Sequence, residues 1–137
     1  WLLDDTGMEM AYACLNATAR DYAKIGELYR LGGRWNGRQI VPEAWVRASV
    51  TPDAPHLLPG VSDPMFGYGY QWWVIDGADG EYAAIGVYNQ FVYVNPARDV
   101  TIVKLSASRN YGTTNDETSF REHETISLFR AIVDEMA

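Results

Sequence analysis

The sequence predicts an α+β fold in which an antiparallel sheet is covered by a C-terminal helix. Between Phe66 and Ser108, apolar runs rich in Val, Ile, Tyr and Trp alternate with the polar clusters 76–80 and 95–99. Such runs between Gly, Asn, Asp and Pro residues are typical of strands joined by tight connections. Connections this short make neighbouring strands antiparallel, because a parallel pair needs a crossover of about a dozen residues or more. One face of the sheet must be covered, and the C-terminal helix is the candidate cover.

We expect strands near residues 68–76, 81–87, 90–95 and 99–106. Their boundaries are uncertain by about two to four residues, as is usual for a prediction from sequence. The segment Tyr88–Gln90 interrupts the sheet at its centre. We therefore expect the functional site to lie there.

Composition bounds the class of protein. At 137 residues the chain forms one domain at most, and its 47% hydrophobic content predicts a packed core rather than disorder. The net charge is −7 without a basic stripe, so nucleic acid and anionic membranes are poor partners. No apolar run approaches the roughly 20 residues that are needed to span a bilayer.

The sequence contains no signal for a cofactor or a metal. It lacks a Gly-rich phosphate loop and a His-Glu-x-x-His motif. Cys14 is alone, which excludes an internal disulfide and a thiolate cluster. We expect it to be a small buried hydrophobe rather than a nucleophile. The start at Trp1 lacks an initiator Met and a basic leader, so we expect the chain to be cut from a longer protein.

The first sixteen residues show no clear period and are expected to form a loop. A helix then begins after Thr18, which can cap it, while Asp21 faces the positive N-terminal end. Gly32-Gly33 ends this helix, because glycine adopts the left-handed conformation without strain. Tyr22, Ile25 and Tyr29 form an apolar face of this helix. The small residues Ala19, Ala23 and Gly26 form a narrow face for close packing.

Two short features follow the first helix. Residues 35–38 form a turn, residues 39–41 are extended, and Pro42 opens a short helix whose Trp45 and Val46 face inward. The next stretch, 51–65, contains four prolines and is expected to be an irregular surface loop. Its length suggests a pocket rim or a lid. His56 within it is interpreted as a solvated loop residue.

The C-terminal region predicts a polar loop at 109–117 and then a helix. Ser119 and Glu122 fit a capping box at the start of this helix, and His123 is expected at the surface. The side chains predicted to pack on the sheet recur at helical spacing and are Phe120, Ile126, Phe129, Ile132, Val133 and Met136.

The residues alone show no assembled catalytic site. None of the six serines is followed three positions later by a lysine, the spacing that places a nucleophile and its base on one helical face. Tyr93-Val94-Asn95 has the letters of a Tyr-x-Asn motif, but it lies inside a predicted strand and is interpreted as a coincidence.

Three segments in consistent order nevertheless resemble a known family. They are LNATARDYAKIGELYRLGGRWNGRQIVPEAWV (15–46), YGYQWW (68–73) and IGVYNQFVYVNPARDVTIVKLSAS (85–108). Together they resemble the C-terminal part of serine hydrolases of the class C β-lactamase-related family, which also resembles penicillin-binding proteins. Within it the chain is most similar to the 6-aminohexanoate-dimer hydrolases and related esterases. The likeness covers about residues 15–106 and is more specific than any single motif.

This resemblance implies a two-lobed enzyme with a Ser-x-x-Lys helix, a Tyr motif, and a third motif on a strand beside the serine. Residues 1–137 would then be the C-terminal part of one β-lactamase-like domain, with 51–65 as its Pro-rich surface loop. Only the third motif is present, as Gly86–Gln90. Tyr88 occupies the position of a His in many relatives, and Asn89 that of a Gly. Because Asn tolerates positive φ, the backbone shape can survive.

The resemblance also implies roles for individual residues. The Val87 backbone N–H is our candidate oxyanion donor, and Tyr88, at the third-motif position, is a polar wall of the pocket. Asn89 and Gln90 are substrate-binding candidates. The alternative, that Tyr88 and Gln90 are ordinary strand residues with local hydrogen bonds, stays open. Trp72 and Trp73 should face opposite sides of the sheet. Core packing is the default interpretation for both. The sharper hypothesis is that one of them contributes to an apolar acyl pocket.

Three functions remain in competition. The first is the C-terminal fragment of a serine hydrolase that acts on small ester, amide or β-lactam-like substrates and is inactive alone because the nucleophile motif is absent. The second is a non-catalytic binding or structural module that keeps the family's sheet. The third is a sugar- or peptide-binding domain that uses exposed tryptophans. An open sheet edge and exposed apolar surface predict a homodimer, or association with the N-terminal part that the resemblance implies.

Overall fold

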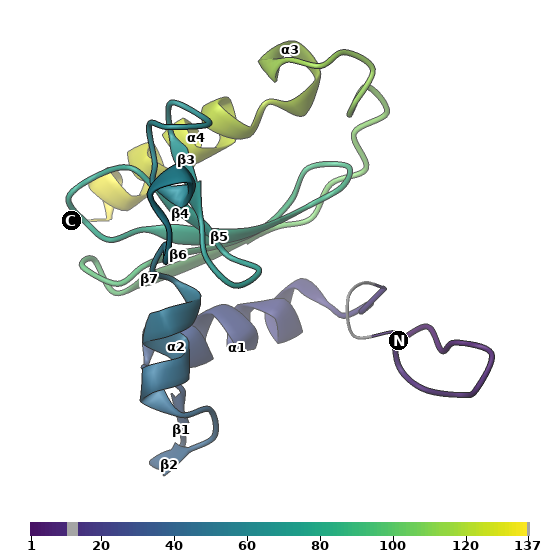
Figure 1. The fold of residues 1–137 in the computed structure, drawn as a ribbon, viewed down its shortest axis with the longest axis vertical. Coiled ribbons are helices and arrows are strands. Elements are labelled where there is room, and N and C mark those ends of the chain that lie inside the picture. The colour runs from purple at the N-terminus through teal and green to yellow at the C-terminus, as the bar shows by residue number, and fades with distance from the viewer. Residues whose placement is uncertain (11–13, 137) are drawn as a thin grey trace.

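A computed structural model describes residues 1–10 and 14–136 of the chain. Its elements before the main sheet are α1 (Ala19–Arg30), β1 (Arg34–Trp35), β2 (Arg38–Gln39), α2 (Glu43–Ser49) and a 3₁₀ turn, η1 (Pro55–Leu57). The sheet strands are β3 (Phe66–Tyr68), β4 (Trp73–Ile75), β5 (Tyr82–Gly86), β6 (Gln90–Asn95) and β7 (Val100–Lys104). Two helices end the chain, α3 (Glu117–Phe120) and α4 (Glu122–Glu135) (Figure 1). Within the described ranges, no helix is long and apolar enough to cross a membrane.

The main sheet has the order β3-β4-β5-β6-β7, and every neighbouring pair is antiparallel. The predicted antiparallel sheet is therefore confirmed. The single strand expected at 68–76 is wrong, because the chain reverses there and forms β3 and β4. Gln71 has a φ of 65° in this turn, and the Gly69 N–H donates to the Trp72 carbonyl over 2.8 Å. Glycine is required at position 69, where a Cβ atom would lie 2.1 Å from the Ser49 carbonyl oxygen.

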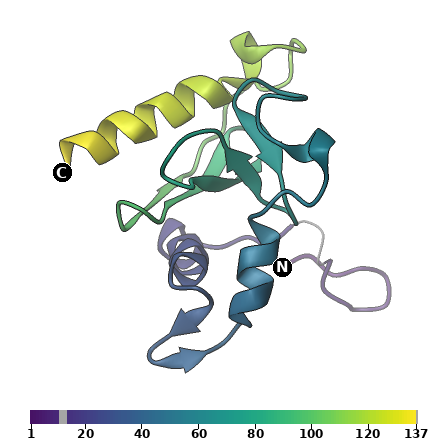
Figure 2. The ribbon, with the colours of Figure 1, turned by 60° about the vertical axis from the view of Figure 1, so that its left-hand side comes forward.

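Helices cover both faces of the sheet (Figure 2). The predicted cover, α4, places Ile126, Phe129 and Val133 against one face. The other face is covered by α1, which approaches closely at Gly26: a Cβ atom there would lie 2.7 Å from Thr101 Cγ2 and 2.8 Å from Val92 Cγ1. This contact confirms the close packing predicted at Gly26, whereas Ala19, also predicted on the narrow face, is exposed. The strand β6 is consequently buried along almost its whole length.

The predicted boundaries of α1 and of the turn after it are confirmed. The Thr18 hydroxyl accepts a hydrogen bond from the Asp21 N–H, and Gly32 and Gly33 both have positive φ. The prediction for Trp45 is wrong, because its side chain is 52% exposed and packs on the Tyr70 ring at 5.6 Å. Sequence periodicity cannot decide this point, since a seven-residue helix buries only the residues that meet a neighbour. Here those residues are Val46 and Ser49, which are 5% and 0% exposed.

The C-terminal helix begins differently from the prediction. Asp116, not Ser119, caps the short helix α3, and Arg121 in the left-handed conformation separates it from α4. The Glu117 carboxylate then accepts from the Glu122 and His123 N–H groups at 3.2 and 3.0 Å, which satisfies the first amides of α4. The expected inward positions of Ile132 and Met136 are also wrong, with exposed fractions of 40% and 66%. The face of α4 that packs on the sheet is therefore narrower than the set of apolar residues that recur at helical spacing in its sequence.

The prediction that His123 is a surface residue is wrong, because its ring contacts Asp63 and Phe66. Its Nε2 atom lies 3.1 Å from an Asp63 carboxylate oxygen, and its ring lies 5.3 Å from the Phe66 ring. Asp63 also accepts hydrogen bonds from the Met65 and Phe66 N–H groups. This pair fastens the end of the Pro-rich loop to the start of α4. His56, in contrast, is exposed as predicted and lies within the 3₁₀ turn η1.

An ion pair between the partly exposed Arg130 and the buried Glu81 holds α4 to the sheet at the opposite end from His123. Glu81 is 3% exposed, and its carboxylate receives the Arg130 guanidinium at 3.0 and 3.1 Å from Nε. The Tyr93 hydroxyl donates to the same carboxylate. Buried charges are tolerated when they are paired and hydrogen-bonded in this way. The Tyr93-Val94-Asn95 letters thus belong to the interior of the sheet, in agreement with the sequence interpretation.

We predict that Phe129→Ala lowers the free energy of unfolding by about 3–5 kcal/mol, because it opens a cavity between α4 and the sheet. The Phe129 ring is 2% exposed and contacts the Phe91 and Tyr93 rings at 5.6 and 5.2 Å. Urea denaturation measures the change. The matched control is Ile132→Ala on the exposed side of the same helix, with a loss of about 0.5 kcal/mol or less. Equal losses for both variants would contradict the packing described here.

A second prediction concerns acid stability. Burial by itself raises the pKa of Asp63, but the Met65 and Phe66 N–H groups and His123 outweigh it and hold that pKa below its ordinary value. The resulting stabilisation is complete above the unfolded-state pKa of about 3.9 and disappears as the pH falls through the lower folded-state pKa. Unfolding free energies measured between pH 5 and pH 2 should therefore fall less steeply in Asp63→Asn. Parallel curves for the variant and the wild type would refute this assignment.

Candidate functional site

A groove lies between α1, the segment 14–17 and the turn end of the β5–β6 hairpin. It encloses about 970 Å³. Four of the residues singled out from the sequence line it, namely Trp72, Val87, Tyr88 and Gln90. Helix α1 contributes an apolar wall through Tyr22, Ile25 and Tyr29. The groove is thus an apolar cleft with a polar hairpin tip at its rim, the usual character of a small-molecule site.

The hairpin tip is a three-residue loop. The last paired residues of the β5–β6 ladder are Gly86 and Gln90, and residues 87–89 lie beyond them. Asn89 has a φ of 72°, as the sequence led us to expect, and Tyr88 also has a positive φ of 63°. The side chains of Val87 and Tyr88 are 65% and 57% exposed. Two of the three tip residues are therefore exposed, while Asn89 is buried at 4% exposure.

One half of β5 has an open edge, although β5 is the central strand in the strand order. Its ladder with β4 ends at Ala83, so residues 84–86 have β6 on one side and no described strand on the other. The Glu81 carbonyl accepts from the Ile75 N–H of β4 over 2.9 Å. Because backbone groups alternate along a strand, Ile85 directs its N–H and carbonyl to the same side as Glu81. At Ile85 that side is the open edge, next to the groove.

The two tryptophans lie on opposite faces, as the alternation predicts. Trp72 is 5% exposed, stacks near Tyr29 at 4.6 Å and Tyr82 at 5.2 Å, and forms part of the groove floor. Trp73 contacts Phe66 and Tyr68 on the α4 side and does not line the groove. Trp72 is therefore the one placed to contribute to a pocket.

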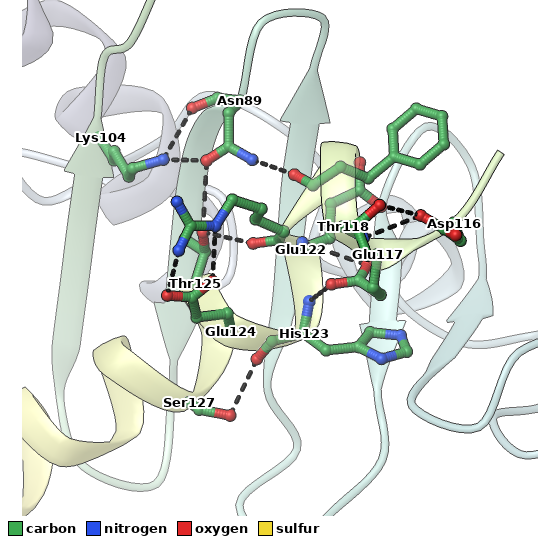
Figure 3. A network of polar contacts seen from close by, with 12 residues as sticks. Asn89, Lys104, Asp116, Glu117, Thr118, Glu122, His123, Glu124, Thr125 and Ser127 are labelled. Atoms are coloured by element: carbon green, nitrogen blue, oxygen red, sulfur yellow. Dashed lines mark hydrogen bonds and ion pairs between the residues drawn. The ribbon is translucent and has the colours of Figure 1, made fainter. Parts of the chain in front are cut away.

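The structure places Asn89 away from the groove. It is 4% exposed, and its side chain points between the sheet and the α3–α4 junction (Figure 3). Its amide nitrogen donates to the Phe120 carbonyl, and its amide oxygen accepts from the Lys104 ammonium and, at 3.2 Å, from the Thr125 hydroxyl. Lys104 also donates to the Asn89 backbone carbonyl over 3.2 Å.

Lys104 and Thr125 are site-region residues that sequence reasoning missed. Register pairs Phe91 with Lys104, which brings this lysine beside Asn89 although fifteen positions separate the two in sequence. Burial lowers the pKa of the Lys104 ammonium, the charge of Arg121 lowers it further, and Glu124 opposes both. The sequence feature that could have indicated the position of Lys104 is a lysine at the end of the apolar strand VTIVK, on the side of the sheet that α4 covers.

Gln90 and Tyr88 make local hydrogen bonds. The Gln90 amide donates to the Ser106 carbonyl and accepts from the Ser106 N–H at 2.9 Å, so the side chain continues the sheet ladder past β7. The Tyr88 carbonyl accepts from the Ser108 N–H at 3.3 Å, and its ring lies 6.3 Å from the Tyr111 ring. Burial raises the pKa of Tyr111 to about 12. The alternative interpretation of Gln90, a residue with local hydrogen bonds, therefore has structural support.

Other chemistry in the groove is sparse. Cys14 lies at its wall, partly buried rather than fully buried as expected. Among the described residues, no group of three or more His, Cys, Asp and Glu side chains is arranged to hold a metal ion. The groove thus offers an apolar surface and backbone groups.

Comparison with known proteins gives consistent results. The family model described as Beta-lactamase matches residues 2–125. A 6-aminohexanoate-dimer hydrolase of Paenarthrobacter ureafaciens is 30% identical over 109 residues, which cover 77% of this chain and 28% of that protein. The structure of a putative 6-aminohexanoate-dimer hydrolase from Bacillus anthracis superposes with a TM-score of 0.75 at 31% identity, covering 97% of this chain and 32% of that one. The chain spans about a third of the length of these relatives.

Proposed function

The chain belongs to the β-lactamase family, and from this premise we propose that it supplies the oxyanion donor and part of the acyl pocket of a serine hydrolase. Its substrates would be small molecules with ester, amide or β-lactam-like bonds. The two relatives described above carry the name 6-aminohexanoate-dimer hydrolase, which supports the same reaction class.

The observation that carries the proposal is the open edge of β5 beside the groove. Residues 81 and 85 direct their backbone groups to the β4 side, and Val87, two positions after Ile85, is the first residue beyond the β5–β6 ladder. When a serine oxygen attacks the substrate carbonyl carbon, the carbonyl oxygen becomes negatively charged. A fixed backbone N–H at the rim stabilises that charge. We assign this donor to Val87, with Tyr88 as the adjoining polar wall and Trp72 as apolar floor.

The attacking serine would come from residues outside these 137. None of the six serines present has a lysine three positions later, and we therefore expect the chain by itself to form no acyl-enzyme. The same observation favours the second candidate, a non-catalytic module that retains the family's sheet. A Ser-x-x-Lys motif elsewhere in the full-length protein distinguishes the two candidates.

Covalent labelling tests the proposed function. A fluorophosphonate or penicillin-type probe should acylate the full-length protein at a serine outside residues 1–137 and should leave the isolated 137-residue chain unlabelled. Peptide mass spectrometry identifies the labelled residue. A labelled serine within residues 1–137 would refute our placement of the nucleophile, and no labelling of the full-length protein would favour the non-catalytic module.

We also propose that the groove region is covered by a second copy of the chain or by the rest of the protein. Trp1 lines the groove, and Trp1, Leu2, Leu3 and Met8 of the N-terminal segment are each more than half exposed. Apolar surface of this kind favours association. Light scattering of the isolated 137-residue chain should give a mass above 15.4 kDa, the mass of one copy. A well-dispersed monomer would contradict self-association and leave the rest of the protein as the proposed cover.

A further inference from the structure

Asn89 joins three parts of the fold that are distant in sequence. From the tip of the β5–β6 hairpin, its side chain reaches Lys104 at the end of β7, the Phe120 carbonyl at the end of α3, and Thr125 in α4 (Figure 3). The described protein leaves no buried side-chain nitrogen or oxygen without a partner. The amide therefore uses both its donor and its acceptor groups in a site closed to solvent.

The backbone at this point is held in an unusual conformation. Tyr88 and Asn89 are consecutive non-glycine residues with positive φ, a region that side chains with a Cβ atom rarely occupy. Such conformations persist when the surrounding structure imposes them. The exposed Val87 and Tyr88 side chains offer little packing. Among the described residues, the polar contacts of the tip are those of Asn89 and the bond from the Ser108 N–H to the Tyr88 carbonyl, and the Tyr88 ring lies 6.3 Å from the Tyr111 ring.

We propose that Asn89 is a positioning residue: through Lys104, Thr125 and the Phe120 carbonyl it fixes the Val87–Tyr88 backbone at the rim of the groove. The inference deepens the proposed function and rests on it, since the group being positioned is the oxyanion donor. Asn89 itself does not touch the groove and faces the opposite side of the sheet. Its role is to keep the Val87 N–H aimed at one place, which is a requirement for stabilising a charge that exists only briefly.

The substitution Asn89→Gly separates the amide from the backbone conformation. Glycine adopts positive φ without strain, so the hairpin path stays accessible while the three side-chain contacts are lost. The matched control is Asn36→Gly, because Asn36 is an exposed residue with a φ of 48° in the β1–β2 turn, remote from the groove. A second variant, Lys104→Met, removes the ammonium that bonds Asn89 and keeps an unbranched apolar chain over the Phe91 ring.

Hydrogen exchange measured by mass spectrometry on the full-length protein tests the positioning directly. In Asn89→Gly and Lys104→Met, amides in a peptide covering residues 86–91 should exchange at least about 10-fold faster than in the wild type. Peptides from residues 92–103 should be unchanged, and Asn36→Gly should match the wild type throughout. Unchanged exchange at 86–91 in both variants would overturn the inference.

The acylation kinetics connect positioning to the reaction. In the full-length protein, Asn89→Gly should lower kcat by about 10- to 100-fold with KM nearly unchanged, because a misplaced donor affects the transition state more than substrate binding. A purely structural role would leave kcat of the folded enzyme unchanged, and this result would also overturn the inference. If the wild type is not acylated at all, the proposed hydrolase function fails, and the exchange experiment still decides whether Asn89 fixes the hairpin tip.

Discussion

The burial of β6 on both faces is the constraint on which the rest of this structure depends. A strand with the sequence QFVYVN presents apolar or aromatic side chains to both sides, so each face of the sheet must be covered by a helix. Helix α4 provides one cover with a narrow apolar stripe, and α1 provides the other by close approach at Gly26. Because α1 must lie close to the sheet there, the space beyond it remains as the groove.

Polar interactions fix the two ends of this sandwich on the α4 side. At one end Glu81, Arg130 and Tyr93 form a charged cluster, and at the other Asn89, Lys104 and Thr125 form a buried amide cluster. Polar groups of this kind are directional, so they set the position of α4 along the sheet more closely than apolar packing does. The amide cluster lies directly behind the hairpin tip. The same contacts that seat α4 therefore determine where the tip backbone lies relative to the groove.

The sequence contained the local features of this fold but not its long-range pairs. The Thr18 cap, the Gly32-Gly33 stop and the positive φ of Asn89 follow from the preferences of single residues. The pairs His123–Asp63 and Lys104–Asn89 join residues 60 and 15 positions apart, and no periodicity encodes them. The exposure of Trp45 escaped prediction because an apolar residue in a short helix is buried only if a neighbour reaches it. For the site, the sequence singled out the third-motif segment, whose residues Val87, Tyr88 and Gln90 line the groove, whereas the inward direction of the Asn89 side chain required the structure.

The central claim is that the Val87 N–H, held at the groove rim by the hairpin, is the donor that receives the developing negative charge. A crystal structure of the full-length protein acylated by a phosphonate tests this claim most directly, because the phosphoryl oxygen takes the place of the oxyanion. We expect this oxygen to lie about 2.7–3.1 Å from the Val87 nitrogen, with the rest of the inhibitor over Trp72. A phosphoryl oxygen bound by other donors, with Val87 turned toward solvent, would contradict the account.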